Sequence, residues 1–360
     1  MSQTNLTQGI HFTSESNLFL EYLTRLTQYA ILANLIVFSQ PVCVFGITSN
    51  IVNILVFVRQ GFQDGVNITL TVLAVSDIGA LMAFQAYIIN YNPLIELKNL
   101  LYRKTLFGFF ALSVHQYFIK TSAMITALAS LERCVSVTMP LSVKLIFTRR
   151  VIVITNVSIL LCPLIFVYPT IQTVNIDWMF LPEMNKTFLT LVFTNASYSV
   201  VTTQQFISNM FLPYLNFSTL IICSTTIFIR MRTRSHWRKS ITQSDVNKYD
   251  GQKERKMTKL LMIVSLVCLA LLLPQCLVLS VLGGHMELYF GSSIQKIGTF
   301  ITCFTLPMQA INCSVNIVIY YKMSTRYRTS LHDLLTCFFK SKRPKTIDLK
   351  SLTFSDKLCN

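Results

Sequence analysis

Long apolar runs, separated by short polar and basic segments, fill most of this chain. Seven of the runs reach about 20 residues, the length that a helix needs to cross the ~30 Å hydrocarbon core of a bilayer. None alternates strictly between apolar and polar residues, as barrel strands do, so each is predicted to be a helix. The pattern predicts an all-α membrane protein, a seven-transmembrane helix bundle over residues 32–321. Its helices are expected near 32–58, 66–91, 105–138, 149–171, 204–231, 254–283 and 294–321.

The segments outside the bundle follow from the same pattern. Residues 322–338 place leucines at helical spacing among polar and basic residues, which predicts a short amphipathic eighth helix on the inner leaflet. Residues 1–31 lack the basic and then apolar arrangement of a cleaved signal peptide, so we expect an extracellular N-terminal segment there. We expect residues 339–360 to be a cytoplasmic tail.

Composition supports a membrane protein, and charge predicts its orientation. Charged residues make up only 13% of the chain, against roughly 25% in a soluble domain. The net charge of +16 would suit a nucleic-acid partner, but the basic residues lie in short segments between apolar runs, so the expected partner is the lipid bilayer and not nucleic acid. The segments predicted to lie outside hold few basic residues: Arg25, Lys98, Arg103, Lys104, Lys186 and Lys296. This asymmetry predicts a multi-pass plasma membrane protein with an extracellular N-terminus and a cytoplasmic C-terminus.

Candidate modification sites lie in the predicted loops and tail. Asn-X-Ser/Thr tripeptides begin at Asn5, Asn185 and Asn195, all in predicted outer segments, and are candidate glycosylation sites. The ten cysteines lie mostly inside apolar runs or on the predicted inner side, so we expect no disulfide framework. Cys337 ends the amphipathic segment and is a candidate palmitoylation site, with a free cytoplasmic thiol as the alternative.

Several polar residues interrupt the apolar runs. Asp77 lies in the middle of the second run, and a carboxylate in mid-membrane is costly enough to be a functional candidate. Ser122 lies in the third run, and Asn312 and Asn316 are four residues apart in the seventh, hence on one helix face. The alternative is a set of unrelated polar residues that hydrogen-bond between helices.

The third run closes on a charged motif, Glu132-Arg133-Cys134. A charged pair at the end of so long an apolar helix is costly if it faces lipid. The alternative is a pair that only marks where the helix leaves the bilayer. Pro213 and Pro274 lie inside the fifth and sixth runs, where a missing backbone hydrogen bond permits a kink.

These motifs follow one another as they do in rhodopsin-like (class A) G protein-coupled receptors, which the chain resembles over about residues 33–337. The resemblance rests on Asn50, Leu73-Ala74-x-x-Asp77, Ser122, Glu132-Arg133-Cys134 and Asn316-x-x-x-Tyr320. It implies a receptor, not an enzyme, which converts binding of an extracellular ligand into activation of a heterotrimeric G protein. The ligand would be a peptide or a chemosensory small molecule.

The resemblance also implies where an ion binds. Asp77, Ser122, Asn312 and Asn316 would line a pocket for an allosteric sodium ion coupled to activation. We expect no other cofactor.

At the inner end, the resemblance implies an ion pair between Arg133 and Glu254 that holds the third and sixth helices together. Glu132 is the neighbour of Arg133 in sequence, and the alternative for Glu254 is a solvated loop charge. The activation switch would include Pro213, Pro274, Asn316 and Tyr320, with Pro274 as the pivot of the sixth helix.

Two residues of the third run are candidate ligand contacts. His115 occupies the family's ligand-facing position, although a histidine near a helix end is often only a satisfied polar residue. Lys120 lies deeper, and a buried lysine needs a partner or must lose its charge. We hypothesise that Lys120 meets an acidic group of the ligand, with snorkelling or an internal partner as the alternatives.

The sequence also departs from the family pattern. Gly108 stands where the family has a cysteine, so the usual outer disulfide is absent. The sixth run reads Leu271-Leu272-Leu273-Pro274, without the usual tryptophan, and Ile317 replaces the proline after Asn316. Such divergence resembles invertebrate branches of chemosensory or neuropeptide receptors.

Two other functions stay open at this stage. Because several switch residues are altered, a decoy receptor that binds ligand without signalling is one alternative. A transporter or channel is the other, although internal repeats with matching helix breaks, which would favour it, are not visible.

Overall fold

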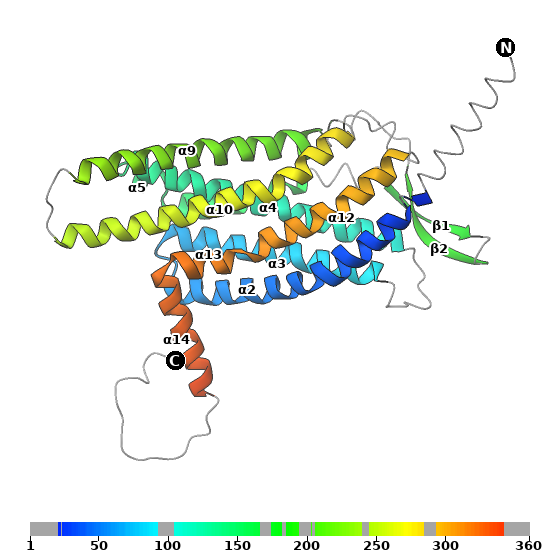
Figure 1. The fold of residues 1–360 in the computed structure, drawn as a ribbon, viewed down its shortest axis with the longest axis horizontal. Coiled ribbons are helices and arrows are strands. Elements are labelled where there is room, and N and C mark those ends of the chain that lie inside the picture. Colours follow the sequence, from blue (N-terminus) through cyan, green and yellow to red (C-terminus); the bar gives the residue numbers. More distant parts are fainter. Residues whose placement is uncertain are drawn as a thin grey trace, which may run out of the picture.

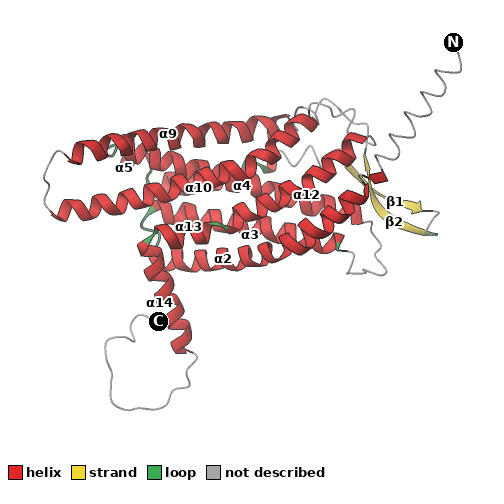
Figure 2. Ribbon diagram, in the orientation of Figure 1, coloured by secondary structure: helices red, strands yellow, loops and turns green. Residues whose placement is uncertain are grey.

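The computed structural model shows long helices that run along one common axis (Figure 1). Among the described residues, strands occur only in one antiparallel hairpin (Figure 2). The hairpin lies at one end of the bundle, which we call the hairpin end. Helix α14 (Thr325–Ser341) turns away from the axis at the opposite end, the α14 end (Figure 1). The structure describes residues 21–22, 24–92, 104–165, 174–181, 185–193, 203, 206–239, 245–283 and 293–341.

The elements follow the chain in a simple order. Before α14 they are η1 (Ile31–Ser39), α2 (Gln40–Gln60), α3 (Gly65–Tyr91), α4 (Lys104–Thr138), α5 (Val143–Ile146), α6 (Arg149–Leu161), β1 (Val174–Leu181), β2 (Lys186–Phe193), η3 (Ile207–Phe211), α9 (Leu212–Lys239), α10 (Asp245–Gly283), α12 (Ser293–Ser314) and α13 (Asn316–Met323). Here η marks a π-helical segment, whose turns are wider than those of an α-helix.

Within the described residues, five helices are long and apolar enough, by length and composition, to cross a membrane. They are Thr24–Gln60, Gly65–Tyr91, Ile207–Thr233, Thr258–Val281 and Phe300–Met323. α4, from the third predicted run, is not among them: it carries His115, Gln116 and Lys120 in its middle. α4 packs against α3, α9 and α10, so these polar side chains lie on a helix with neighbours on several sides.

The helix of the fourth predicted run is interrupted by a turn within the described residues. α6 begins at Arg149, where the Thr148 side chain accepts a hydrogen bond from the Val151 amide, and it ends at Leu161. Cys162 and Pro163 form a turn, because a proline does not continue a regular helix. Residues 166–171 of the predicted span lie outside the described part of the chain.

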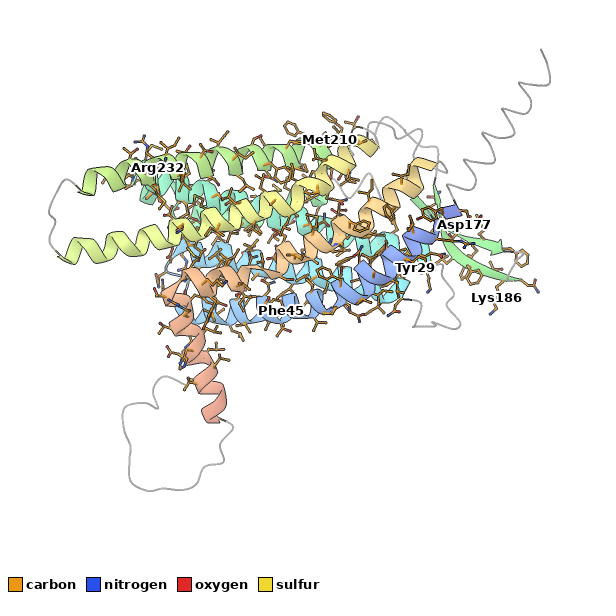
Figure 3. The ribbon with its side chains drawn as sticks, viewed as in Figure 1. Tyr29, Phe45, Asp177, Lys186, Met210 and Arg232 are labelled. Carbon is orange, nitrogen blue, oxygen red and sulfur yellow. The ribbon has the colours of Figure 1, made fainter. Side chains whose placement is uncertain are left out.

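The bundle exposes apolar side chains and buries polar ones, as a protein in lipid does. Apolar side chains such as Phe45, Ile222 and Val281 are 53%, 64% and 68% exposed, and Phe45 points away from the bundle in Figure 3. Asp77 and His115, in contrast, are fully buried. An aqueous surface would not carry so much large apolar area, so the solvent around these helices is a bilayer. The chain is an all-α membrane protein with one added hairpin.

Prolines account for both π-helical segments. Pro213 has no N–H to give to the carbonyl of Asn209, and its ring would clash there in a regular α-helix. The chain widens into η3, which includes Asn209, directly before this proline. Pro41 follows η1 in the same way. Pro213 therefore lies inside the continuous helix Ile207–Thr233, as the sequence predicted, and its effect is a wide turn before α9.

The seventh run is divided although it lacks the family's proline after Asn316. α12 ends at Ser314, and α13 begins at Asn316 after a turn at Val315. The Ser314 hydroxyl donates to the carbonyl of Ala310 at 2.7 Å, a back-bond that bends helices. It also lies 3.2 Å from the carbonyl of Val42 on α2. A serine thus contributes here to a break that the sequence pattern did not reveal.

The first and seventh helices approach closely at Gly46. A methyl group at this position would overlap the Ser314 hydroxyl and would lie 2.6 Å from the Leu81 side chain. Larger side chains at residue 46 would therefore push α2 away from α12. The glycine allows α2, α3 and α12 to pack together around the site described next.

Gly108 is also closely packed. A methyl group at Gly108 would lie 2.7 Å from the ring of Tyr91, so a tyrosine at the end of α3 fills this space.

The β1–β2 hairpin follows α6 in the chain, and the sequence did not predict it. Asn185 forms its turn with a φ of 49° and is exposed. Asn5 and Asn195 lie outside the described residues.

Candidate functional site

A buried carboxylate joins three helices at the centre of the bundle. Asp77 on α3 accepts a hydrogen bond from the Ser122 hydroxyl of α4 at 2.7 Å and one from the Asn316 amide of α13 at 2.8 Å. The thiol of Cys313 on α12 also bonds to it. All four side chains are buried. A carboxylate away from water needs several donors, and here they come from three different helices, so Asp77 links their relative positions.

The first helix joins this cluster through a backbone contact. The Asn50 amide donates to the carbonyl of Cys313 at 2.8 Å and to that of Gly46 at 2.9 Å. Asn312 is buried one residue before Cys313, but its side chain makes no hydrogen bond to Asp77. The structure thus brings Asp77, Ser122 and Asn316 into direct contact and leaves Asn312 beside them.

The chemistry of this group suits a small hard cation. It offers one carboxylate with hydroxyl and amide oxygens, the ligands that such ions prefer. Among the described residues, no group of three or more His, Cys, Asp or Glu side chains could hold a metal ion. One negative charge with neutral oxygens fits a monovalent ion better than a divalent one.

A chain of hydrogen bonds continues from this cluster to α14. The Tyr327 hydroxyl donates to the side-chain oxygen of Asn53 at 2.6 Å, and the Asn53 amide donates to Asn50 at 3.2 Å. Burial raises the pKa of the Tyr327 phenol well above its usual value, so the hydroxyl keeps its proton and stays a donor. The Tyr327 ring also lies 5.7 Å from that of Tyr320, centre to centre. α14 is therefore tied to α2 and α13 by both polar and aromatic contacts.

We expect Tyr327→Phe to lower the free energy of unfolding by about 1–3 kcal/mol, because the buried Asn53 oxygen loses its donor. Thermal unfolding of the purified protein measures this. Tyr321→Phe is the matched control, since Tyr321 is 52% exposed and should leave the melting temperature unchanged. Equal effects of the two substitutions would contradict a structural role for the Tyr327 hydroxyl.

Arg133 lies at the α14 end of α4 without a strong partner among the described residues. Its guanidinium is 3.5 Å from the Glu132 carboxylate, and both side chains are largely buried. The Nε atom of Arg133 is buried with no hydrogen-bond partner among the described residues. The side chain of residue 254 is not described, so the predicted ion pair between Arg133 and Glu254 lies outside the described residues. An under-satisfied guanidinium is thus held just below the surface.

A hydroxyl pair joins α4 to α10 one turn from Arg133. Ser130 and Ser265 are both buried, and their oxygens lie 2.5 Å apart. Each hydroxyl also lies close to a carbonyl of its own helix, that of Thr126 or Leu261, so one serine donates to its carbonyl and the other donates to that serine. The described contact between these two helices near Arg133 is therefore a neutral one.

A small cavity lies nearer the hairpin end, between α4, α9, α10 and α12. Its volume is about 40 Å³. The walls are mainly apolar, with a few amides and one amine. The residues that line it are Gln116, Ile119, Lys120, Ala123, Met124, Pro163, Asn209, Leu212, Pro213, Asn216, Phe217, Leu272, Gln275, Cys276, Leu279 and Gln309. Concave, mostly apolar sites with few polar groups are typical of small-molecule sites.

Lys120 is the one charged residue among the described residues that line this cavity. Its ammonium donates to the Ser208 hydroxyl at 2.5 Å and to the Asn209 side-chain oxygen at 2.9 Å, both in η3. The internal partners that the sequence analysis kept as an alternative therefore exist, but they are neutral. α4 is tethered to the wide turn in front of Pro213 through this amine.

His115 lies outside the cavity lining. It is fully buried between α3 and α12, with Nδ1 2.9 Å from the Ala80 carbonyl and Nε2 2.9 Å from the Gln309 side-chain oxygen. This agrees with the structural alternative, in which His115 is a satisfied polar residue, and its contact with a ligand stays a prediction. Gln309 does line the cavity and also accepts from Gln116 at 3.3 Å, so His115 fixes the orientation of a cavity residue.

The comparison with known protein families agrees with this architecture. The sequence profile of the serpentine-type 7TM GPCR chemoreceptor family Srw matches residues 37–338, which include the Asp77 cluster, Arg133, the cavity and most of α14. The chain belongs to this chemoreceptor family. It is a G protein-coupled chemosensory receptor, and the transporter or channel alternative is set aside. No curated protein matches the chain.

Sequence reasoning missed several residues that the receptor places at these sites. Asn53, Ser130, Ser265 and Gln309 all make buried hydrogen bonds between helices. Asn53 could have been found, because it lies three residues after Asn50 on one helix face. A lone serine or glutamine in an apolar run carries no comparable signal.

Proposed function

We propose that this chemoreceptor is a rhodopsin-like (class A) receptor of the plasma membrane, with the hairpin end outside the cell and the α14 end in the cytoplasm. Occupation of the cavity by an extracellular ligand would favour a packing of the helices that binds a heterotrimeric G protein. The observation that carries this proposal is the Asp77 cluster, which joins α3, α4 and α13 between the cavity and Arg133.

The sixth helix is the proposed moving element. Pro274 lies inside α10 directly before Gln275, a cavity residue that accepts a hydrogen bond from Thr305 on α12. A ligand that changes contacts at Gln275 acts beside the weakest point of this helix. If the α14-end half of α10 pivots there, Ser265 separates from Ser130. One such hydrogen bond contributes about 1 kcal/mol, or roughly a fivefold shift between two packings.

Separation of α10 from α4 would expose Arg133 to the G protein. The guanidinium already has an unsatisfied Nε atom, so a carbonyl or carboxylate of the G protein would gain a charge-assisted hydrogen bond. If Glu254 also pairs with Arg133 in the closed packing, that ion pair adds to the Ser130–Ser265 contact. Tyr320 would support the open packing from α13.

Sodium would stabilise the closed packing. Asp77 and Ser122 would hold the ion, with the amide oxygens of Asn312 and Asn316 beside them. The ion supplies a positive charge that offsets the buried carboxylate.

Cys337 lies on α14 with its sulfur 3.7 Å from the Arg59 side chain, a place suited to a palmitoyl anchor. Glycosylation at the exposed Asn185 fits an outer hairpin.

Epitope accessibility in intact cells, together with G protein activation, tests this proposal. We expect an N-terminal tag to be stained without permeabilisation and a C-terminal tag only after it. In the same cells, pools of small molecules and peptides should cause dissociation of at least one type of heterotrimer. Reversed tag accessibility, or no response in any heterotrimer, would contradict the proposal.

A further inference from the structure

The cavity of this receptor contains a positive charge that no described residue of its lining neutralises. The Lys120 ammonium is half-buried and bonds to a hydroxyl and an amide oxygen. No aspartate or glutamate occurs among the described residues that line the cavity. A buried cation without a counter-charge is costly in a membrane interior, so it is typically conserved for binding an anion or kept in contact with water.

We infer that the ligand is a small apolar molecule with one carboxylate group, which pairs with the Lys120 ammonium. This inference rests on the proposed function, because it assumes that the cavity is the ligand site. It selects a small chemosensory molecule over a peptide and an acid over an amine.

The shape and walls of the cavity support a small ligand. Its ~40 Å³ is well below the ~150 Å³ of a cavity that holds benzene, so the site must widen for any ligand, and a small ligand needs the least widening. Ile119, Phe217, Leu272 and Leu279 offer apolar contacts to the body of such a molecule. A peptide would need an open and much larger site.

The contacts of Lys120 also suggest how an acid would act. A carboxylate is a stronger partner for an ammonium than the Ser208 hydroxyl or the Asn209 amide oxygen, because both charges contribute to the hydrogen bond. It would therefore compete with the contacts that tether α4 to η3. η3 is already a wide turn before Pro213, so loss of the tether frees α9 at a point where it is weakly constrained. A ligand carboxylate that pairs with the Lys120 ammonium would thus alter the packing of α4 against α9.

Binding to the purified receptor in nanodiscs tests the inference without any signalling step. The probes are butanoic, hexanoic, octanoic and benzoic acids, with the corresponding primary amides as neutral controls. We expect at least one acid to raise the melting temperature and its amide to have no effect. Lys120→Met should weaken binding of that acid at least tenfold, whereas Lys120→Arg, which keeps the charge, should retain most of it.

Ser208→Ala separates a ligand role of Lys120 from a merely structural one. It removes a competitor for the ammonium, so the acid should bind several-fold more tightly, although the unliganded protein becomes less stable. Equal binding of acids and amides, unchanged acid binding in Lys120→Met, or no binding by any acid would overturn the inference. An acid that binds through Lys120 but activates no heterotrimer would instead contradict the proposed function.

Discussion

Replacement of Arg133 by alanine is expected to abolish G protein activation while the receptor still reaches the cell surface. Arg133 is the described cation at the α14 end of α4, and its Nε atom has no partner within the described part of the chain. Its contact with Glu132 is long, at 3.5 Å, and joins neighbours on the same helix, so its removal breaks no described ion pair between helices. The loss should therefore appear in signalling and not in folding. Heterotrimer dissociation and surface staining, measured in the same cells, separate these effects.

Arg149→Ala is the matched control for this prediction. Arg149 is an exposed arginine at the start of α6, at the same end of the bundle. It should signal like the parent. Full activation by Arg133→Ala, or equal losses in both variants, would contradict a specific role for Arg133.

Substitution of Asp77 should have the largest effect on stability inside the bundle. Asp77→Leu leaves the buried donors of Ser122 and Asn316 without an acceptor, and each such loss costs about 1–3 kcal/mol. We expect a large fall in the melting temperature of the purified receptor. Asp77→Asn keeps the size and part of the hydrogen bonding, so it should be much less destabilising.

Asp77→Asn in addition tests the sodium proposal. In the parent, sodium chloride should raise the melting temperature above that in N-methylglucamine chloride at equal ionic strength. A sodium concentration of 100 times the dissociation constant would raise the free energy of unfolding by about 2.7 kcal/mol. Asp77→Asn should lose this difference, because the carboxylate charge is gone. A sodium effect of equal size in both proteins would exclude Asp77 as the ion's ligand.

The hydrophobic pattern predicted the fold class because a bilayer allows few solutions for an apolar chain. The meeting of Asp77, Ser122 and Asn316 was also predictable, since a buried carboxylate must find donors and these residues lie at matching depths. Helix ends were harder to predict. The division at Ser314 depends on a side-chain back-bond, and the end of α6 depends on a turn at Pro163, neither of which changes the hydropathy of the run.

Partners across the bundle were the least predictable feature. Lys120 meets Ser208 and Asn209 because η3 is π-helical, and a wide turn shifts which side chains face inward. His115 faces Ala80 and Gln309, whereas Lys120, on the same helix, lines the cavity. The rotation of a helix about its own axis decides which side chains face a cavity. It is set by the packing of all the helices together, and the pattern of a single run does not contain it. The β1–β2 hairpin carries only a short alternation in sequence, Val174-Asn175-Ile176-Asp177-Trp178, which is shorter than the apolar runs around it.

Nucleotide exchange by purified heterotrimers tests the central claim most directly. The receptor in nanodiscs would be mixed with each of a panel of heterotrimers, with and without the pool of small acids, beside empty nanodiscs and the Arg133→Ala variant. We predict that the parent accelerates exchange on at least one heterotrimer, that the acids increase this rate, and that Arg133→Ala matches empty nanodiscs. Exchange rates equal to those of empty nanodiscs for every heterotrimer, with a folded parent receptor present, would contradict the account.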